Sequence, residues 1–314
     1  MTEKTKFKKH SNAVVTCCNG NWLPYAAATF LSCVRQGSAD MADAIIVVCD
    51  VNEDQIKKFK SFLAAHDFDV TLIVFDPEDD LYRVPTGRVT VATLLRLKFD
   101  SLLPSHYERV LCLDCDIQAL APLNELLEID LEGNCIGAVV DYIGLPEKAD
   151  DAKIHLQKAG IPFDAGYFNS GIMIMDWQKT LKGDYLKRAL DLVYAAVNRG
   201  VPSTTPDQDA LNLVFQGSWL SIPLKFNLQN YFSDFFPIAP VFRHFTTQYK
   251  PWQDKWAPGY SRYRRFYVEA FDKSDWRGLV RPKFSGVAFK FTVECLWRKI
   301  DFVTRAKLAR FMTF

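Results

Sequence analysis

The stretch VLCLDCD, residues 110–116, decides the fold of this chain. Its apolar half predicts a buried strand, and its acidic half follows where a strand of an α/β sheet opens onto a ligand crevice. Asp114 and Asp116 are two residues apart, so an extended chain directs both carboxylates to the same face. Two such carboxylates repel unless a cation lies between them, and Mg²⁺ or Mn²⁺ commonly joins carboxylates to phosphate. The motif therefore predicts a metal–diphosphate site, although acidic residues also crowd ordinary strand-to-loop junctions.

Strands and helices alternate on both sides of this motif. Apolar runs predict strands at residues 13–18, 44–49, 70–75, 110–113, 135–140 and 168–177. Helical spacing predicts helices at residues 24–34, 53–66, 90–103 and from 178 to about 198, and Asn52 with Gln55 has the pattern of a capping box. This alternation implies an α/β fold with a parallel sheet and right-handed crossovers. Residues 144–167 are polar and weakly patterned, which predicts a long loop or lid.

Composition narrows the class of protein. The 314 residues are 49% hydrophobic and 24% charged, which supports a sizeable core and argues against global disorder. The net charge of +1 argues against a nucleic-acid partner. The sequence contains neither a glycine-rich dinucleotide fingerprint nor a P-loop, so phosphate is expected to be bound by metal and side chains.

The sequence also carries expectations about location. The basic N-terminus is not followed by an apolar signal core, and no apolar run reaches the length of a membrane span. Eight irregularly spaced cysteines fit reduced thiols, which favours a cytoplasmic protein. Cys112 and Cys115 have a redox-like spacing, but positions three apart on a strand face opposite sides, which favours ordinary core thiols.

Four further segments could contribute to chemistry. They are Arg96 in the helix before the acidic motif, FNSG at 168–171, PDQDALN at 206–212, and HFTTQYKPW at 244–252. The last three have ordinary alternatives: a tight turn, a helix start with acidic residues, and a buried histidine followed by a surface turn. Their joint occurrence in this order favours a functional interpretation.

With these motifs the chain resembles glycosyltransferase family 8, which includes bacterial lipooligosaccharide galactosyl- and glucosyltransferases and glycogenin. The resemblance rests on LxLDxD, FNSG, DQDxLN and Hx₅KPW and runs from about residue 13 to 252. It implies a GT-A fold, which is Rossmann-like with a mostly parallel sheet, over residues 1–256. It also implies a UDP-sugar donor, Mn²⁺ (or Mg²⁺) as cofactor, and transfer of glucose or galactose with retention of anomeric configuration.

The resemblance carries metal and diphosphate roles to particular residues. Asp114, Asp116 and His244 match the metal ligands, and an imidazole with two carboxylates suits Mn²⁺. Lys250 matches a diphosphate-binding lysine. Arg96 matches a residue near the diphosphate and the donor sugar.

The same resemblance assigns the rest of the donor site. Asn169, Asp207 and Gln208 match catalytic positions around the transferred sugar, and Asn19 and Trp22 match positions around uracil and ribose. The remaining positions assigned to donor binding are Cys115 and Thr247. Two residues depart from the family pattern: Asn19 replaces a common acidic residue, and Thr247 replaces a glycine beside the diphosphate, where a Cβ crowds the backbone.

The mechanism and the class of enzyme stay open at this level. Retention could use covalent attack by Asp207 or Gln208, or front-side attack with the leaving phosphate as base, and the poor nucleophilicity of an amide favours the second. A nucleotidyltransferase would also use paired carboxylates, and a non-catalytic family member would bind the donor without turnover. A glycan or glycolipid of the bacterial cell envelope is the expected acceptor by family analogy.

The C-terminal extension, residues 257–314, has a character of its own. From residue 277 onward nine Lys or Arg residues stand against two acidic ones, and large apolar residues are interleaved with them. Leu296, Ile300 and Val303 form an apolar stripe at helical spacing. We expect a basic amphipathic helix on an anionic membrane, where each cation contributes about 1 kcal/mol, which would make the protein peripheral on the inner face of the cytoplasmic membrane. The alternative is a helix that packs back on the catalytic domain.

Overall fold

The computed structural model describes residues 10–84, 90–144, 149–200, 205–230, 238–254, 260–280 and 293. The chain forms two compact units, Met1–His244 and Phe245–Phe314. The membrane helix predicted over 284–314 lies outside the described residues, apart from Val293, and the predicted domain limit after residue 256 stays a prediction. Within the described part, no helix combines the length and the apolar character needed to cross a bilayer.

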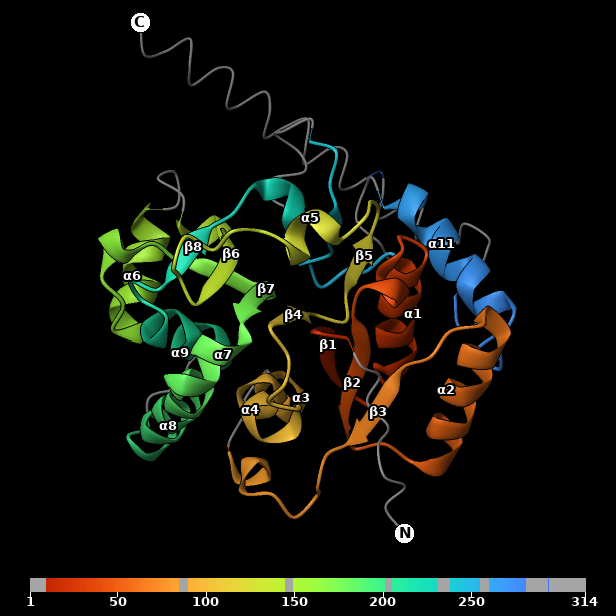
Figure 1. Cartoon of the computed structure of the whole chain (residues 1–314), viewed down its shortest axis with the longest axis horizontal. Coiled ribbons are helices and arrows are strands. Elements are labelled where there is room, and N and C mark those ends of the chain that lie inside the picture. The colour runs from red at the N-terminus through yellow and green to blue at the C-terminus, as the bar shows by residue number, and fades with distance from the viewer. Residues whose placement is uncertain are drawn as a thin grey trace, which may run out of the picture. The chain divides into compact units, whose positions relative to one another are not determined.

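The first unit is built on a seven-stranded sheet with the order β3-β2-β1-β4-β7-β6-β8 (Figure 1). The strands are β1 (Asn12–Asn19), β2 (Asp43–Cys49), β3 (Thr71–Val74), β4 (Arg109–Leu113), β6 (Ile136–Val140), β7 (Phe168–Asp176) and β8 (Trp219–Ser221). The pairs β1–β2, β2–β3 and β1–β4 are parallel, which confirms the parallel α/β half expected from the sequence. The carboxyl ends of these strands therefore meet at one edge of the sheet.

Strand β7 does not run parallel to its neighbours, as simple strand–helix alternation would predict. It pairs antiparallel with both β4 and β6, while β6 and β8 are parallel. The register sets Leu113 opposite Ile172, so the start of β7 lies beside the end of β4. This reversal brings the FNSG segment to the edge where the acidic motif leaves the sheet.

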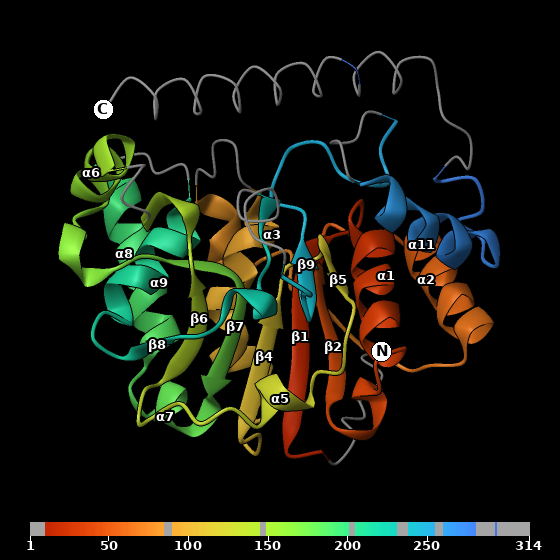
Figure 2. The same cartoon turned by 90° about the horizontal axis from the view of Figure 1, so that it is seen from above.

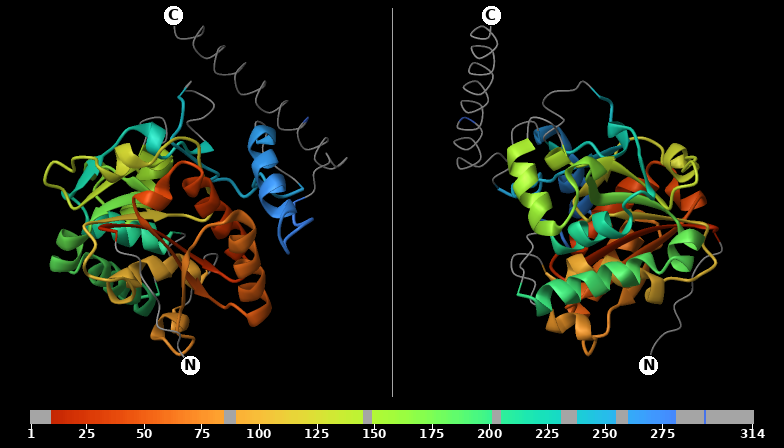
Figure 3. Two further views of the ribbon diagram at one scale, coloured as in Figure 1. Left: turned by 45° about the vertical axis from the view of Figure 1, so that its right-hand side comes forward. Right: turned by 90° about the vertical axis from the view of Figure 1, so that its left-hand side faces the viewer.

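Helices cover both faces of the sheet. Figure 1 shows α1 (Leu23–Val34) and α2 (Glu53–His66) on one face, with α3 (Val91–Leu94), α4 (Phe99–Leu102) and α8 (Tyr185–Asn198) on the other. The remaining helices of this unit are α5 (Asn124–Leu127), α6 (Ala149–Ala159), α7 (Trp177–Lys182) and α9 (Pro206–Val214). Helices α8 and α9 lie side by side at the β7–β6 end of the sheet (Figures 2 and 3). An extensive core cluster joins β1, β2 and β4 to η3 (Leu95–Lys98), α4 and α8.

The structure corrects three expectations about helices. Residues 144–167 are not a plain loop, because they contain α6. This helix is held by a small separate core around Leu156, Ile161 and Tyr167, and not by a long apolar stripe of its own. The helix predicted at 90–103 is broken by a 3₁₀ segment, η3. The helix predicted to run to 198 is divided into α7 and α8, with Asp184 between them in the left-handed region at φ 50°.

A two-stranded antiparallel sheet completes the first unit. It pairs β5 (Ile117–Ala119), directly after the acidic motif, with β9 (Phe242–His244). The register sets Ile117 opposite His244. Two segments almost 130 residues apart in the sequence are thereby fixed next to each other.

The second unit is organised by aromatic residues. Its segment after Phe245 packs on α11 (Ser261–Asp272), where the Phe245 ring meets the rings of Tyr260, Tyr263 and Tyr267 at centroid distances of 4.9–6.3 Å. The Arg264 guanidinium donates to the Pro251 and Gln253 carbonyl oxygens at 2.8 and 2.7 Å. The KPW segment therefore folds together with residues beyond 256.

Candidate active site

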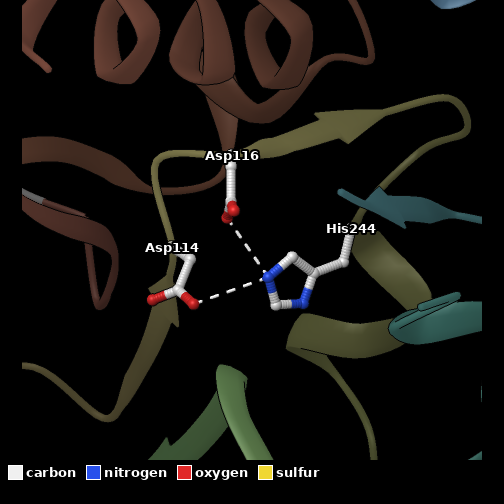
Figure 4. A group of neighbouring side chains, drawn as sticks. All are labelled: Asp114, Asp116 and His244. Atoms are coloured by element: carbon white, nitrogen blue, oxygen red, sulfur yellow. Dashed lines mark ion pairs between the residues drawn. The ribbon is translucent and has the colours of Figure 1, made fainter. Parts of the chain in front are cut away.

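Three side chains from separate motifs gather at the end of β4. Ligand atoms of Asp114, Asp116 and His244 all lie within 4.8 Å of one another. The His244 Nε2 is 3.5 Å from an Asp114 carboxylate oxygen and 3.2 Å from an Asp116 oxygen (Figure 4). This is the set that the sequence predicted as metal ligands, and the β5–β9 pairing explains how the distant histidine reaches it.

Gly171 is required for this approach of the side chains. Its carbonyl oxygen accepts from the Asp114 backbone N–H at 2.7 Å. A Cβ on Gly171 would lie 2.3 Å from His244 Cε1 and 2.7 Å from an Asp114 carboxylate oxygen. The last residue of the FNSG motif is thus a glycine because the cluster fills the space of a side chain.

The hydrogen bonds behind His244 test whether the cluster fits a metal ion. His244 Nδ1 is 3.0 Å from Asn227 Oδ1, and an amide oxygen can only accept, so Nδ1 carries the proton. Nε2 is then the ring nitrogen that faces the two carboxylates and is placed to bind a metal ion, as in a metal-binding histidine. One neutral imidazole nitrogen and two carboxylates are a donor set that suits Mn²⁺ or Mg²⁺, so the residues fit the implied group.

Arg96 joins this cluster to the second motif. Its guanidinium forms an ion pair with Asp114, reaches Asp207 at 3.4 Å and donates to the Ser170 carbonyl oxygen at 2.7 Å. It is only 4% exposed, and the tight 3₁₀ turn of η3 directs it inward from the helix before β4. A buried guanidinium needs such partners, and its rigid fork fixes their mutual positions.

Asp207 lies at the start of α9 in a buried, charged environment. Burial raises the pKa of this carboxyl to about 6, against the lowering effect of Arg96 and with a further rise caused by Asp114. At neutral pH its carboxylate is therefore ionised but poorly solvated. It is directed at the same pocket as Asp114.

An amide network surrounds the predicted sugar site. Gln208 Oε1 accepts from the Ser170 N–H at 3.0 Å, and Asn169 Nδ2 donates to Asp141 at 2.9 Å. Asn169 Oδ1 accepts from Asn227 Nδ2 at 2.8 Å and from the Gly171 N–H at 3.1 Å. Asp207 and Gln208 line the cavity, and Asn169 lies behind it, where its Nδ2 donates to Gln208 Oε1 at 3.4 Å. Their roles at a sugar stay predictions.

Two members of this network were missed by the sequence analysis. Asp141 is 3% exposed, and burial raises its pKa. It directly follows the apolar run 136–140 as Asp114 follows β4, and this repeated pattern could have identified it. Asn227 lies in no motif, so only the structure shows that it holds His244.

The cavity between these groups has a volume of about 410 Å³, which is within the usual size of a ligand site. Its wall continues from Arg96, Asp114 and Asp207 to Cys115, Asn19 and Trp22. The predicted donor-binding residues of the first unit therefore share one cavity. Burial raises the pKa of the Cys115 thiol well above its usual value, so this cysteine is a neutral wall group.

Lys250 and Thr247 belong to the second unit. The Lys250 ammonium donates to the Phe245 carbonyl oxygen, and the Thr247 hydroxyl donates to the Tyr249 carbonyl oxygen at 2.9 Å. Their roles at the diphosphate stay predictions.

Comparison with known proteins identifies the class. A solved structure of the galactosyltransferase LgtC, with donor and acceptor sugar analogues, superposes with a TM-score of 0.68 over 82% of this chain and 95% of that chain at 19% identity, which shows a shared GT-A fold. The lipopolysaccharide 1,2-glucosyltransferase of Escherichia coli K12 is 26% identical over 274 residues, 82% of this chain and 77% of that protein. The lipopolysaccharide 1,3-galactosyltransferase of Salmonella typhimurium is 27% identical over 235 residues, 72% of this chain and 67% of that protein. Residues 13–256 match the sequence model of glycosyl transferase family 8, and the chain belongs to this family.

Proposed function

We propose that this glycosyltransferase is a metal-dependent, retaining enzyme that moves glucose or galactose from a UDP-sugar to a glycan or glycolipid of the cell envelope. The observation that carries the proposal is one cavity lined by Asp114, Asp116, Arg96 and Asp207, with His244 clustered on the two aspartates of its wall. Family membership and relatives named for lipopolysaccharide glucosyl and galactosyl transfer support the sugar and the acceptor.

The proposed roles follow from the chemistry of leaving diphosphate. Mn²⁺ held by Asp114, Asp116 and His244 would supply Lewis-acid stabilisation of the charge that develops on the diphosphate. Arg96 pairs with both Asp114 and Asp207, so its positive charge would be shared between the proposed metal–diphosphate group and the proposed sugar group. We assign the diphosphate's second cation to Lys250, from the family resemblance.

The sugar is proposed to bind against Asn169, Asp207 and Gln208. Because Gln208 Oε1 accepts from the Ser170 N–H and hydroxyl, its Nε2 is the group left to donate toward Asp141 and a sugar hydroxyl. The ionised Asp207 carboxylate would stabilise positive charge on the anomeric carbon as the C–O bond breaks. This arrangement favours front-side attack by the acceptor hydroxyl over covalent attack by Gln208, since an amide is a weak nucleophile.

UDP release from UDP-glucose and UDP-galactose, with Mn²⁺ and with excess chelator, tests the proposal. Asp114→Asn and Asp116→Asn should nearly abolish release, while Asp191→Asn, an exposed aspartate on α8, serves as the matched control. Full activity in chelator, or in either cluster variant, would overturn the metal assignment. Pyrophosphate release from UTP would indicate a nucleotidyltransferase, and UDP binding without turnover a non-catalytic protein.

The C-terminal extension is proposed to hold the enzyme at the membrane surface. Its basic and aromatic composition is the support, since residues 281–292 and 294–314 lie outside the described part. A glycolipid acceptor at the inner leaflet would then be within reach of a cytoplasmic enzyme.

A further inference from the structure

The turn after β1 lines the same cavity as Asp207. Its residues Asn19 and Trp22 line the cavity together with Cys115 and Cys18. In the sheet, β4 lies between β1 and β7. Asp114, directly after β4, therefore lies between this turn and Ser170 near the start of β7, which donates to Gln208. In a nucleotide sugar whose diphosphate is bound at the two carboxylates, the nucleoside and the sugar extend to opposite sides of the metal cluster. If the sugar lies against Asp207, as proposed above, the nucleoside lies at Asn19 and Trp22.

The turn is rigid. The Gly20 N–H donates to the Cys49 carbonyl oxygen at 3.0 Å, and a Cβ on Gly20 would lie 2.3 Å from Gln55 Oε1. Gln55 belongs to the capping box of α2 and donates to Asn21 Oδ1 at 3.4 Å. The backbone around Asn19 is therefore fixed by the end of β2 and the start of α2.

The orientation of the Asn19 amide is set by this backbone. Its Oδ1 accepts from the Asn21 N–H at 3.1 Å and from the Trp22 N–H at 3.2 Å. Both lone pairs of the amide oxygen are thereby used, and the opposite orientation would set two N–H groups against Nδ2. Within the described part of the chain, Nδ2 donates no hydrogen bond. The chemistry that Asn19 can offer a ligand is donation alone.

We propose that Asn19 selects the nucleobase as a hydrogen-bond donor to a base carbonyl oxygen, in contrast to an acidic side chain, which would accept the ring N–H. The inference rests on the proposed nucleotide-sugar donor and adds the polarity with which its base is recognised. Trp22 supports a flat ring at this place, because its indole is held edge-on against Tyr25 with ring centroids 5.5 Å apart. Uracil carries two carbonyl oxygens beside its N–H, so it satisfies a donating amide.

Asn19→Asp reverses the polarity with little other change. It keeps Oδ1 for the Asn21 and Trp22 N–H groups and exchanges Nδ2, a donor, for an oxygen that can only accept. Competition binding in the presence of Mn²⁺ should compare UDP with 2-thio-UDP and 4-thio-UDP, in which sulfur, a weak acceptor, replaces one base oxygen. Asn198→Asp, at the exposed end of α8, adds the same charge outside the cavity and is the matched control.

The expected result is a crossed pattern. One thio analogue should bind the wild type and the Asn198 variant about 3- to 10-fold more weakly than UDP, the value of one neutral hydrogen bond. This deficit should disappear in Asn19→Asp, which cannot use the carbonyl oxygen. Equal ratios of UDP to thio-UDP affinity in wild type and Asn19→Asp, or a deficit confined to Asn19→Asp, would overturn the inference and leave the transferase proposal standing. Failure of the wild type to bind UDP would overturn both.

Discussion

Replacing Asp207 with asparagine is expected to stabilise the metal-free protein at neutral pH while it removes activity. Asp207 is 4% exposed, and burial raises the pKa of its carboxyl from 3.8 to about 6, opposed by Arg96 and increased further by Asp114. The ionised side chain is therefore less favourable in the folded protein than in the unfolded chain. Asparagine has nearly the same shape and never ionises.

The magnitude follows from proton linkage. Below pH 3.8 the carboxyl is protonated in both states, and its full contribution to stability is present. Between pH 3.8 and about 6 the folded state holds more protons than the unfolded state, so stability falls as the pH rises. A pKa difference of about 2 gives a loss on the order of 3 kcal/mol, complete above about pH 6. The asparagine variant does not undergo this loss.

Thermal unfolding in chelator-containing buffer, from pH 4.5 to 8, measures the difference. For a domain of this size about 3 kcal/mol corresponds to a midpoint about 6–12 °C higher for Asp207→Asn at pH 7.5, and the gain should shrink toward pH 4.5. UDP release should fall strongly in the same variant, as in other active sites where function costs stability. A midpoint below that of the wild type at pH 7.5, or a difference that does not change with pH, would refute this account of Asp207. The exposed Asp191→Asn should show neither effect.

Three further outcomes are expected. Lys250→Ala should weaken UDP binding by about 10- to 100-fold if the ammonium contacts phosphate. Lys273→Ala, at an exposed lysine, is the control and should leave the affinity unchanged. An unchanged affinity of Lys250→Ala in titration calorimetry would show that Lys250 only stabilises its own turn. The hydrogen bond to Asp209 at 2.9 Å raises the pKa of His155 in the folded protein. The stabilisation from this ion pair should be complete below the unfolded-state pKa of 6.5 and should be lost as the pH rises through the raised folded-state pKa. The unfolding midpoint of His155→Gln should therefore approach that of the wild type with rising pH, and a constant gap would contradict the ion pair. Truncation after Val280 should abolish sedimentation with anionic vesicles at low salt and preserve UDP-sugar hydrolysis; a full-length protein that ignores such vesicles would exclude the membrane role of the tail.

Local patterns made much of the fold predictable. The capping box of α2 has its two reciprocal hydrogen bonds, and β1, β2 and β4 occupy the predicted runs within a residue or two. These elements are read well because their apolar residues are contiguous and their ends carry distinctive polar residues. The acidic motif also falls at the end of a parallel strand, as expected.

The direction of β7 and the presence of α6 depend on tertiary packing. An apolar run has the same appearance in a parallel and in an antiparallel strand, so the sequence of β7 does not show that it is reversed beside β4. Of the α6 side chains that the structure describes, Leu156 is the fully buried apolar one, and it packs in the small core with Ile161 and Tyr167. Such a helix has too little periodicity to be detected from sequence alone.

In the candidate site, too, some contacts were predictable from local motifs and others depend on tertiary packing. Asp114, Asp116 and His244 come together as the motifs predicted, yet the residue that orients His244 was not predictable, because a single asparagine in an apolar region has no pattern. What makes Asn227 necessary is a contact with a residue 17 positions away along the chain. Sequence motifs predicted a group of residues for donor binding, and the structure adds Asn227, which holds His244.

The buried amides connect the sugar end of the site to the metal cluster in one direction. The Asp141 carboxylate can only accept, so Asn169 turns its Nδ2 toward it and its Oδ1 toward Asn227. Asn227 then donates through Nδ2 and accepts through Oδ1, which leaves His244 to donate from Nδ1. Reversing any one amide would place two donors or two acceptors face to face in a buried position, at a cost of about 1–3 kcal/mol for each unsatisfied group. A carboxylate three links away therefore keeps a proton on His244 Nδ1 and leaves Nε2 facing Asp114 and Asp116, where a metal ion would bind.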